Sequence, residues 1–256
     1  MDPEDQIPAH DETGPSDMTH PALSPQDAAQ WNVRFAQAHP IEILRWAVDT
    51  FRTDVALTSS FGAKSAGLLH MAMQVDPRLP IRVVDTGLLF PETYQFMAAL
   101  TKRFALNVEI IKTRLDVEQF KREHAHLPIG HPDFCCSPYK VEATERALAG
   151  LRCWITGISR GDAPTRAATP FVEVLETGLV KVAPLAAWTS QQLHAYMTQH
   201  DLPYHPLWSK GYTSIGCWPC TAKPADPNDP RSGRWPGQAK TECGIHDIGK
   251  PPVSNS

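Results

Sequence analysis

The stretch of sequence that decides the fold is Val55-Ala56-Leu57-Thr58-Ser59-Ser60-Phe61-Gly62-Ala63-Lys64-Ser65. Its first four residues are a short apolar run, which predicts a strand, and residues 66–75 have the period of an amphipathic helix. Small residues between a strand and a helix N-terminus let backbone N–H groups approach an anion. The spacing of a Walker loop is absent, so the turn over 59–65 fits either a phosphate or sulfate cradle or an ordinary tight turn.

The same alternation continues along the chain. Short apolar runs are followed by segments with helical period, which predicts crossover units and a mostly parallel sheet flanked by helices, an α/β fold. Two later runs around Thr177-Gly178 predict a hairpin. The predicted strands are 81–84, 108–111, 153–156, 171–174 and 180–182. One helix is predicted to begin after Pro91, and three others are predicted over 116–122, 141–149 and 189–200.

The two ends differ from this core in composition. Helices over 25–38 and 40–51, each begun by a proline, precede the first strand. Residues 1–23 are polar, without hydrophobic period, and we expect a disordered tail. Residues 203–256 are rich in Pro, Gly, Trp and Cys, which suits a functional lid or a metal-ordered tail of the same domain as residues 24–202.

Composition excludes several classes of protein. The chain has 256 residues, 42% of them hydrophobic, and 24 basic against 28 acidic side chains give a net charge of −4. No apolar run approaches the roughly 20 residues that span a bilayer, and the acidic N-terminal segment does not resemble a secretory signal. We therefore expect a cytoplasmic protein without membrane insertion. The near-neutral charge also argues against a general nucleic-acid binder.

The six cysteines are the most informative part of the composition. In a reducing compartment they suit metal ligation or catalysis better than disulfides. The turn over 217–220 is a Cys-x-x-Cys motif, and with the adjacent Cys135 and Cys136 it offers four thiolates for tetrahedral zinc or an iron–sulfur cluster. The alternative is a redox dithiol with an unrelated buried pair. Cys153 begins an apolar strand and is expected to be a buried structural thiol.

The remaining cysteine stands in Glu242-Cys243-Gly244-Ile245-His246. Positive charge from a nearby histidine lowers a thiol pKa, so Cys243 is a candidate nucleophile, with an incidental exposed thiol as the alternative. Asp85-Thr86-Gly87 follows a predicted strand, at the sheet edge where doubly wound folds bind ligands, although by itself it is more often a turn. Cationic side chains that suit capture of sulfate or phosphate, or else lie solvated on a surface, are Lys140, Arg160, Arg166, Arg231 and Arg234.

Taken in order, these motifs closely resemble the thioredoxin-dependent, iron–sulfur type of assimilatory adenylyl-sulfate (APS) reductase, within the PAPS/APS reductase family. Relatives that act on the 3′-phosphorylated substrate (PAPS) typically keep the catalytic cysteine motif but lack both cysteine pairs. The resemblance runs from residue 40 to residue 247 and is carried by Ser60-Phe61-Gly62-Ala63, Asp85-Thr86-Gly87 with Leu89-Phe90-Pro91-Glu92-Thr93, Cys135-Cys136 with Lys140, Leu202-Pro203-Tyr204, Gly211-Tyr212-Thr213-Ser214-Ile215-Gly216-Cys217 with Cys220, and the segment 242–246.

The resemblance implies a Rossmann-like fold of the adenine nucleotide alpha-hydrolase type, with a nucleotide-binding reductase domain over 24–202 and a mobile catalytic tail over 203–256. It implies that Cys243 attacks the sulfur of APS, that AMP leaves, and that thioredoxin releases sulfite from the resulting S-sulfocysteine. It implies one four-iron, four-sulfur cluster per chain on Cys135, Cys136, Cys217 and Cys220. The substrate-binding positions that it implies are Ser59, Ser60, Phe61, Gly62, Ser65, Asp85, Thr86, Gly87, Lys140, Arg160, Arg166, Arg231, Arg234 and His246.

Within that site, the cations that gather charge on the sulfonyl group are expected at Lys140, Arg231, Arg234 and His246. The cluster is expected to act by electrostatics, placing Lys140, rather than by passing electrons. The chain departs from the family at three places, none of which is a cluster ligand or the nucleophile. The proline usual after Lys140 is missing, Ser159 replaces the first arginine of a usual pair, and Pro236 cuts short an aromatic run.

Other functions fit part of these features. The nearest alternative is a reductase that uses PAPS or accepts both nucleotides. A pyrophosphate-loop nucleotidyl transferase or hydrolase with a structural zinc, or an iron–sulfur sensor that has kept the fold, would explain fewer of the motifs. A homo-oligomer is compatible with the fold family, but the sequence identifies no interface.

Overall fold

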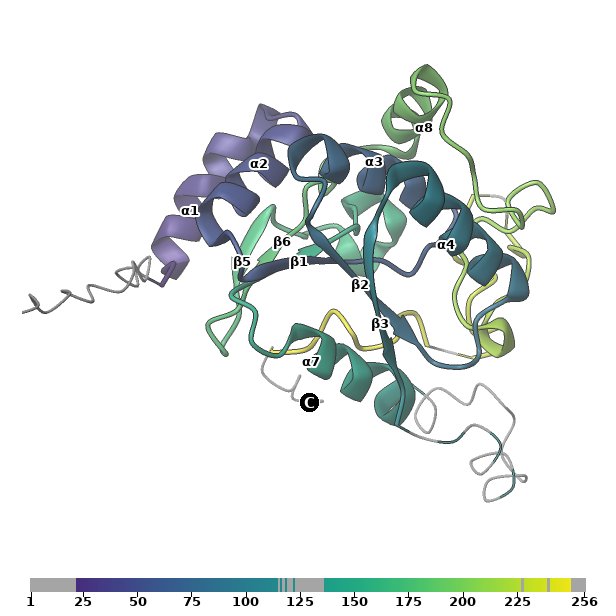
Figure 1. The fold of residues 1–256 in the computed structure, drawn as a ribbon. Helices are drawn as coiled ribbons and strands as arrows, with labels where there is room; N and C mark the ends of the chain where they lie inside the picture. The colour runs from purple at the N-terminus through teal and green to yellow at the C-terminus, as the bar shows by residue number, and fades with distance from the viewer. Residues whose placement is uncertain are drawn as a thin grey trace, which may run out of the picture.

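A six-stranded sheet with helices on both faces forms the centre of the molecule (Figure 1). Its strands lie in the order β3-β2-β1-β4-β6-β5, where β5 and β6 are antiparallel and the other four pairs are parallel. This confirms the predicted mostly parallel α/β sheet and its terminal hairpin. The strands are β1 (Val55–Thr58), β2 (Pro80–Asp85), β3 (Asn107–Lys112), β4 (Cys153–Thr156), β5 (Val172–Val174) and β6 (Val180–Val182).

The helices are divided between the two faces of the sheet. Helices α2 and α3 pack together on one face, and α7 packs on β2 and β3 from the opposite face (Figure 1). The helices are α1 (Pro25–Arg34), α2 (Pro40–Phe51), α3 (Ser65–Val75), α4 (Pro91–Phe104), α7 (Glu142–Leu148) and α8 (Ser190–Gln199). The computed structural model describes residues 22–114, 116, 118, 122, 136–226, 228–238 and 240–249.

Local sequence signals explain where the helices begin. At α1, the Ser24 side chain accepts a hydrogen bond from the Asp27 N–H, and the Asp27 carboxylate accepts one from the Ser24 N–H at 2.9 Å. Thr189 caps α8 in the same reciprocal way, and a proline begins α1, α2 and α4. These caps satisfy N–H groups that a helix leaves unpaired. The predicted tail over 1–23 and the predicted helix over 116–122 fall mainly outside the described residues.

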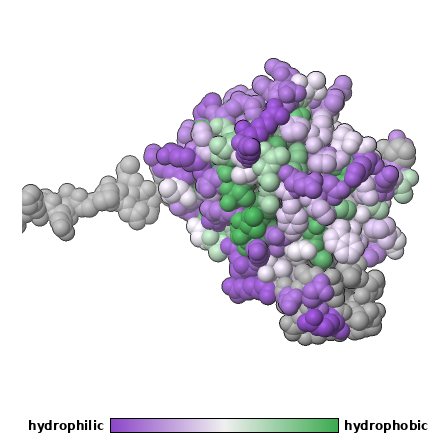
Figure 2. Space-filling view, turned by 45° about the vertical axis from the view of Figure 1, so that its right-hand side comes forward, coloured by the Kyte–Doolittle hydropathy of each residue, from purple (hydrophilic) through white to green (hydrophobic). Residues whose placement is uncertain are grey.

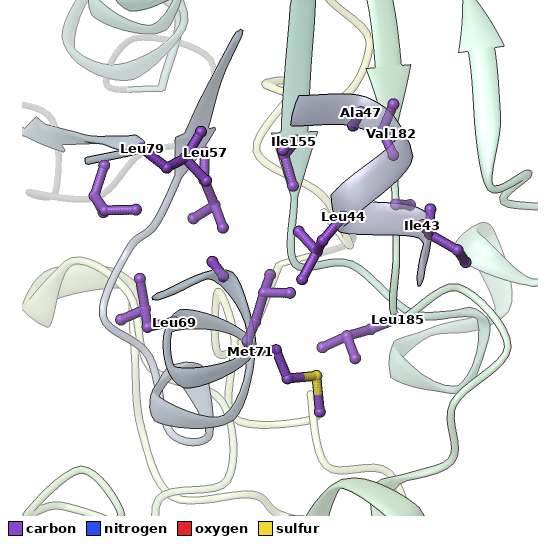
Figure 3. Packing of buried hydrophobic residues seen from close by; sticks show 14 of the residues in the cluster. Ile43, Leu44, Ala47, Leu57, Leu69, Met71, Leu79, Ile155, Val182 and Leu185 are labelled. Carbon is purple, nitrogen blue, oxygen red and sulfur yellow. The ribbon is translucent and has the colours of Figure 1, made fainter. Parts of the chain in front are cut away.

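The main core lies between the sheet and the helices α2 and α3 (Figure 3). Cys153 is fully buried in this core, as predicted, and burial raises the pKa of its thiol. Side chains that meet there are Ile43, Leu44 and Ala47 from α2, Leu69 and Met71 from α3, Leu57, Ile155 and Val182 from the strands, and Leu79 and Leu185 from loops. Because β1 is paired on both sides, by β2 and β4, its C-terminal end is held firmly.

Beyond α8 the chain is mostly irregular and returns to the sheet. Isolated bridges join Leu89 to Cys217 and Thr221 to Arg234. Near its end the chain, yellow in Figure 1, runs between the sheet and α7, where Ile248 packs against a buried cluster that includes Trp154. The C-terminal segment is thereby brought close to β4.

In the part of the chain that the structure describes, few large hydrophobic side chains are exposed. On the face seen in Figure 2, a narrow hydrophobic band is surrounded by hydrophilic side chains. Exposed large hydrophobic residues are Val33, Ile110 and Trp218. Among the described residues, no helix combines the length and the apolar character that crossing a membrane requires.

Candidate active site

A cavity of about 310 Å³ lies where β1, β2 and β4 end. Its walls include Thr58 and Thr156, which are paired in the sheet, and Thr86 just after β2. Because the carboxyl ends of parallel strands meet at one edge, side chains that follow different strands converge there. The loop from β1 to α3 forms one wall, and the segment 242–246 forms part of another.

The β1–α3 loop, residues 59–64, is organised by its own hydrogen bonds. The Phe61 N–H donates to Ser59 Oγ at 3.1 Å, and Ser65 Oγ donates to the Gly62 carbonyl at 3.0 Å. Phe61 adopts a φ of 47° and is fully buried, which anchors the loop. No side chain caps the N-terminus of α3, so its positive end is available to an anion in the cavity.

The Cys243 thiol lines the same cavity and is only 8% exposed. Burial by itself would raise the pKa of this thiol, but Lys140, a hydrogen bond from the Ile245 N–H and Arg234 together lower it. In return, the Cys243 thiolate raises the pKa of Lys140 against the effect of burial. The site therefore favours a thiolate paired with an ammonium group, the reactive form of a nucleophilic cysteine.

His246 does not supply the positive charge that the sequence predicts. Burial, followed by the repulsion of Lys181 and Arg166, holds the pKa of His246 well below its usual value. Its ring stacks on Trp154, with centroids 5.7 Å apart and planes 8° apart, and its carbonyl accepts a hydrogen bond from Lys181. This lowered pKa disfavours the charged imidazolium that the sequence-based prediction of a cation at His246 requires.

Two arginines of the cavity are engaged by Glu242. Arg166 makes a bidentate pair with its carboxylate at 2.7 and 2.8 Å, and Arg231 donates to it at 3.2 Å. Burial would raise the pKa of Glu242, but the hydrogen bonds and charge of Arg166 outweigh it, and the pKa lies below its usual value. Glu242 belongs to the motif that suggested a nucleophile, but sequence reasoning assigned it no role.

Arg234 connects the cavity to the Cys-x-x-Cys turn. Its Nε donates to the Cys220 carbonyl at 3.2 Å, and its guanidinium lies 4.6 Å from the centre of the Trp235 ring. It packs so closely on Gly216 that a Cβ there would lie 2.5 Å from Nη2. A glycine is therefore required at this position for the guanidinium to keep its place.

The described cysteines of the two predicted pairs lie near one another. Cys136 and Cys220 are buried, and burial raises the pKa of both thiols, that of Cys220 to about 11, with further contributions from the neighbouring thiols. Cys217 Sγ lies 3.3 Å from Thr86 Oγ1. None of the three forms a disulfide bond with another described residue. Cys135 lies outside the described residues, and within those residues no three His, Cys, Asp or Glu side chains are grouped to hold one metal ion.

Four predicted substrate-binding residues do not line the cavity. The Asp85 carboxylate accepts hydrogen bonds from the Tyr94 hydroxyl at 2.7 Å and the Gly87 N–H at 2.8 Å, so it closes its own turn. Arg160 donates to the Thr169 carbonyl at 2.8 Å and lies over the Phe171 ring. Phe61 and Gly87 are the other two. The predicted positions that line the cavity are Ser59, Ser60, Gly62, Ser65, Thr86, Lys140, Arg166, Arg231, Arg234, His246, Cys217 and the candidate nucleophile Cys243.

Comparison with known proteins agrees with this architecture. The phosphoadenosine phosphosulfate reductase domain matches residues 54–223. An adenosine 5′-phosphosulfate reductase of Rhodococcus opacus is 39% identical over 80% of this chain and 87% of its own length. A phosphoadenosine 5′-phosphosulfate reductase of Gloeobacter violaceus is 42% identical over 86% of this chain and 91% of its own length.

Solved structures point to the same relatives. The phosphoadenylyl-sulfate reductase of Candida auris, in a phosphate complex, superposes with a TM-score of 0.68 at 30% identity and covers 77% of this chain and 96% of its own. The FMN adenylyltransferase of Candida glabrata, at 13% identity and a TM-score of 0.53, shares the fold alone. From the matched domain and the relatives at about 40% identity, the chain belongs to the phosphoadenosine phosphosulfate reductase family.

Proposed function

We propose that this protein reduces APS to sulfite and AMP in assimilatory sulfate reduction. The observation that carries the proposal is the Cys243 thiol, which faces the cavity of the β1–α3 loop with a pKa that Lys140 and Arg234 lower. A nucleophilic sulfur thus lies beside a site suited to a nucleotide anion, as transfer of a sulfo group requires. Relatives from Rhodococcus opacus and Mesorhizobium japonicum, named for this activity, are 39% and 42% identical to this chain.

In the first step, the Cys243 thiolate attacks the sulfur atom of APS. A bond forms between Sγ and that sulfur, the bond from sulfur to the bridging oxygen breaks, and AMP leaves with the electron pair. Lys140 and Arg234 balance the charge on the sulfonyl oxygens, because the same two cations already act on the thiolate. Neutral His246, whose Nδ1 is buried without a described partner, contributes a hydrogen bond rather than a charge.

The nucleotide half of the substrate is assigned to the opposite wall. Ser59, Ser60, Gly62 and Ser65 line the cavity around the N-terminus of α3. Backbone N–H groups and the helix dipole at such a terminus stabilise a phosphate without any base-specific contact. Thr86, at the end of the neighbouring strand, completes this wall.

In the second step, thioredoxin resolves the S-sulfocysteine at residue 243. A thioredoxin thiolate attacks Sγ, sulfite leaves, and a mixed disulfide forms. The second thioredoxin thiol breaks that disulfide, which leaves thioredoxin oxidised by two electrons and regenerates Cys243. Because Cys243 is only 8% exposed, the segment that carries it must leave the cavity before a protein thiol can reach it.

The two cysteine pairs are assigned a four-iron, four-sulfur cluster, on Cys135, Cys136, Cys217 and Cys220. Support comes from the three described members, whose thiols lie near enough to contribute to one another's pKa. In such a cluster each thiolate would bond a different iron. When bound, the cluster supplies a local charge that helps to orient Lys140, which follows Cys136 on the same turn.

The discriminating experiment is steady-state sulfite release from APS and from PAPS, with thioredoxin as the donor. We expect sulfite and AMP in equal amounts from APS. Sulfite from PAPS alone would instead favour the second candidate, which the name of the Gloeobacter relative at 42% identity supports. We also expect about four iron atoms per chain and a brown protein, and a colourless protein with zinc would overturn the cluster.

A further inference from the structure

Glu242 is the residue next to the nucleophile, and donors from two other parts of the chain surround its carboxylate. Arg166 donates from Nε and Nη2 at 2.7 and 2.8 Å, and Thr165 Oγ1 donates at 3.2 Å. Arg231 donates from Nη2 at 3.2 Å, and the same nitrogen reaches the Thr241 carbonyl at 2.9 Å. Both the side chain of Glu242 and the backbone just before it are therefore held in place.

The ion pair between Glu242 and Arg166 is largely buried and has bidentate geometry. The exposed fractions of the side chains are 20% for Glu242, 13% for Arg166 and 15% for Arg231. A bidentate arginine–carboxylate pair at such depth is stronger and less screened than a surface pair. Because Glu242 and Cys243 are consecutive, the position of the carboxylate limits where the thiol can lie.

Four of the cations that line the cavity thus form two pairs with different partners. Lys140 and Arg234 lower the pKa of Cys243, whereas Arg166 and Arg231 bind the carboxylate beside it. Arg166 and Arg231 thus bind this carboxylate before substrate binds. The role of these two arginines in the closed structure is to hold the nucleophile, in addition to any contact with substrate.

We propose that Glu242 is a positioning residue that, through Arg166 and Arg231, holds the segment 240–246 closed over the cavity with the Cys243 thiol beside Lys140. Breaking this pairing is then what frees the segment for attack by thioredoxin. The catalytic consequence rests on the proposed function, but the positioning itself can be measured without turnover.

The test is the rate of alkylation of Cys243 by iodoacetamide across pH in the holoprotein. Trypsin cleavage after Lys240 yields a peptide that starts at Thr241 and contains Cys243 as its single cysteine, so mass spectrometry follows this thiol alone. In Glu242→Gln, removal of a neighbouring negative charge would by itself lower the thiol pKa. Release of the thiol from Lys140 would raise the thiol pKa and expose it.

We expect the effect of releasing the thiol from Lys140 to outweigh the effect of removing the charge of Glu242. Glu242→Gln should raise the pKa of the thiol and increase its limiting alkylation rate at high pH about tenfold. Glu242→Asp, which keeps the charge, should restore most of the protection. Asp247→Asn is the matched control, since it removes the same charge from an exposed position directly after this segment, and its alkylation profile should equal that of the wild type.

An unchanged limiting rate with a lowered thiol pKa in Glu242→Gln would overturn the proposal. The result is separable from the proposed function. If the wild type releases no sulfite but the alkylation profiles behave as expected, only the proposed function fails. If sulfite is released normally and the Glu242→Gln profile matches that of Asp247→Asn, only the positioning role fails.

Discussion

Two segments face each other across the cavity and are held by different means. The β1–α3 loop follows a strand paired on both sides, and hydrogen bonds between residues two or three positions apart shape it from within. Hydrogen bonds to Ala63 and from Lys64 join it to His205 and Ser190. The segment 240–246 is held by Arg166, Lys181 and the Trp154 ring, at sequence separations of 65 residues and more, and by Arg231, which is 11 residues from Glu242. The loop is therefore prearranged for binding, whereas the catalytic segment is attached by a few polar contacts that can be broken and remade.

The largest expected effect distinguishes the role of Cys243 in the reaction from the role of the β1–α3 loop in nucleotide binding. Cys243→Ser should lower sulfite release at least roughly 10³-fold, because a serine hydroxyl is not ionised near neutral pH. Binding of AMP, measured by calorimetry, should be retained, since the β1–α3 loop is untouched. Loss of AMP affinity in this variant would mean that the two walls are not independent.

A smaller effect tests the charge on the catalytic side. Lys140→Met should raise the pKa of Cys243, because Lys140 favours the thiolate. The thiolate fraction at pH 7 then falls, so the single-turnover rate should drop by about 10- to 100-fold and recover as the pH rises.

The control for that experiment lies on the opposite wall. Lys64 also lines the cavity, but it donates to Ser190 Oγ at 2.8 Å. Lys64→Met should leave the pH profile of the thiol in place. An equal displacement of the profile in both variants would refute a specific effect of Lys140.

The close packing of the backbone at Gly233 offers a way to destabilise residues 220–246 without changing the β1–α3 loop. A Cβ on Gly233 would lie 2.2 Å from the Ala222 carbonyl oxygen, so Gly233→Ala forces a backbone shift next to Arg234. We expect a loss of about 3 kcal/mol in stability. Hydrogen exchange should increase over 220–246 and stay unchanged over 55–65. Gly161→Ala is the comparison, because an added Cβ there meets no described atom within 4 Å.

The smallest effect concerns the support of the loop. The His205 N–H donates to the Ala63 carbonyl, and its Nε2 lies 3.0 Å from Thr93 Oγ1. Burial lowers the pKa of His205 to about 4, while Glu92 opposes this weakly. A lowered pKa means that the folded state resists protonation, so its stabilisation is complete above the unfolded value of about 6.5 and is lost as the pH falls toward 4.

The free energy of unfolding in urea gives the measurement. Between pH 7 and pH 4.5, the wild type should lose roughly 2 kcal/mol more than His205→Gln. Equal losses in the two proteins would show that protonation of His205 costs the fold nothing.

Much of the fold could be predicted because its signals are local. Ser24, Thr189 and the helix-starting prolines place helix ends, and short apolar runs place strands, as the structure confirms. The nucleophile motif and the small-residue turn were also visible as candidates. The directions of the side chains could not be predicted, because a motif match does not determine them. Arg160 points to the Thr169 carbonyl and the Phe171 ring, and the Asp85 carboxylate accepts a hydrogen bond within its own turn.

The sequence by itself determined the order of strands and helices, the family, and the positions of the cysteines, since each depends on residue type and spacing along the chain. Only the tertiary structure decided that Cys243 and Lys140 line one cavity, that Glu242 binds both Arg166 and Arg231, and that burial lowers the pKa of His246. The reason is physical. Burial and electrostatic coupling depend on distances in space, and Lys140 and Arg166, which act on Cys243 and Glu242, lie far from them in the chain.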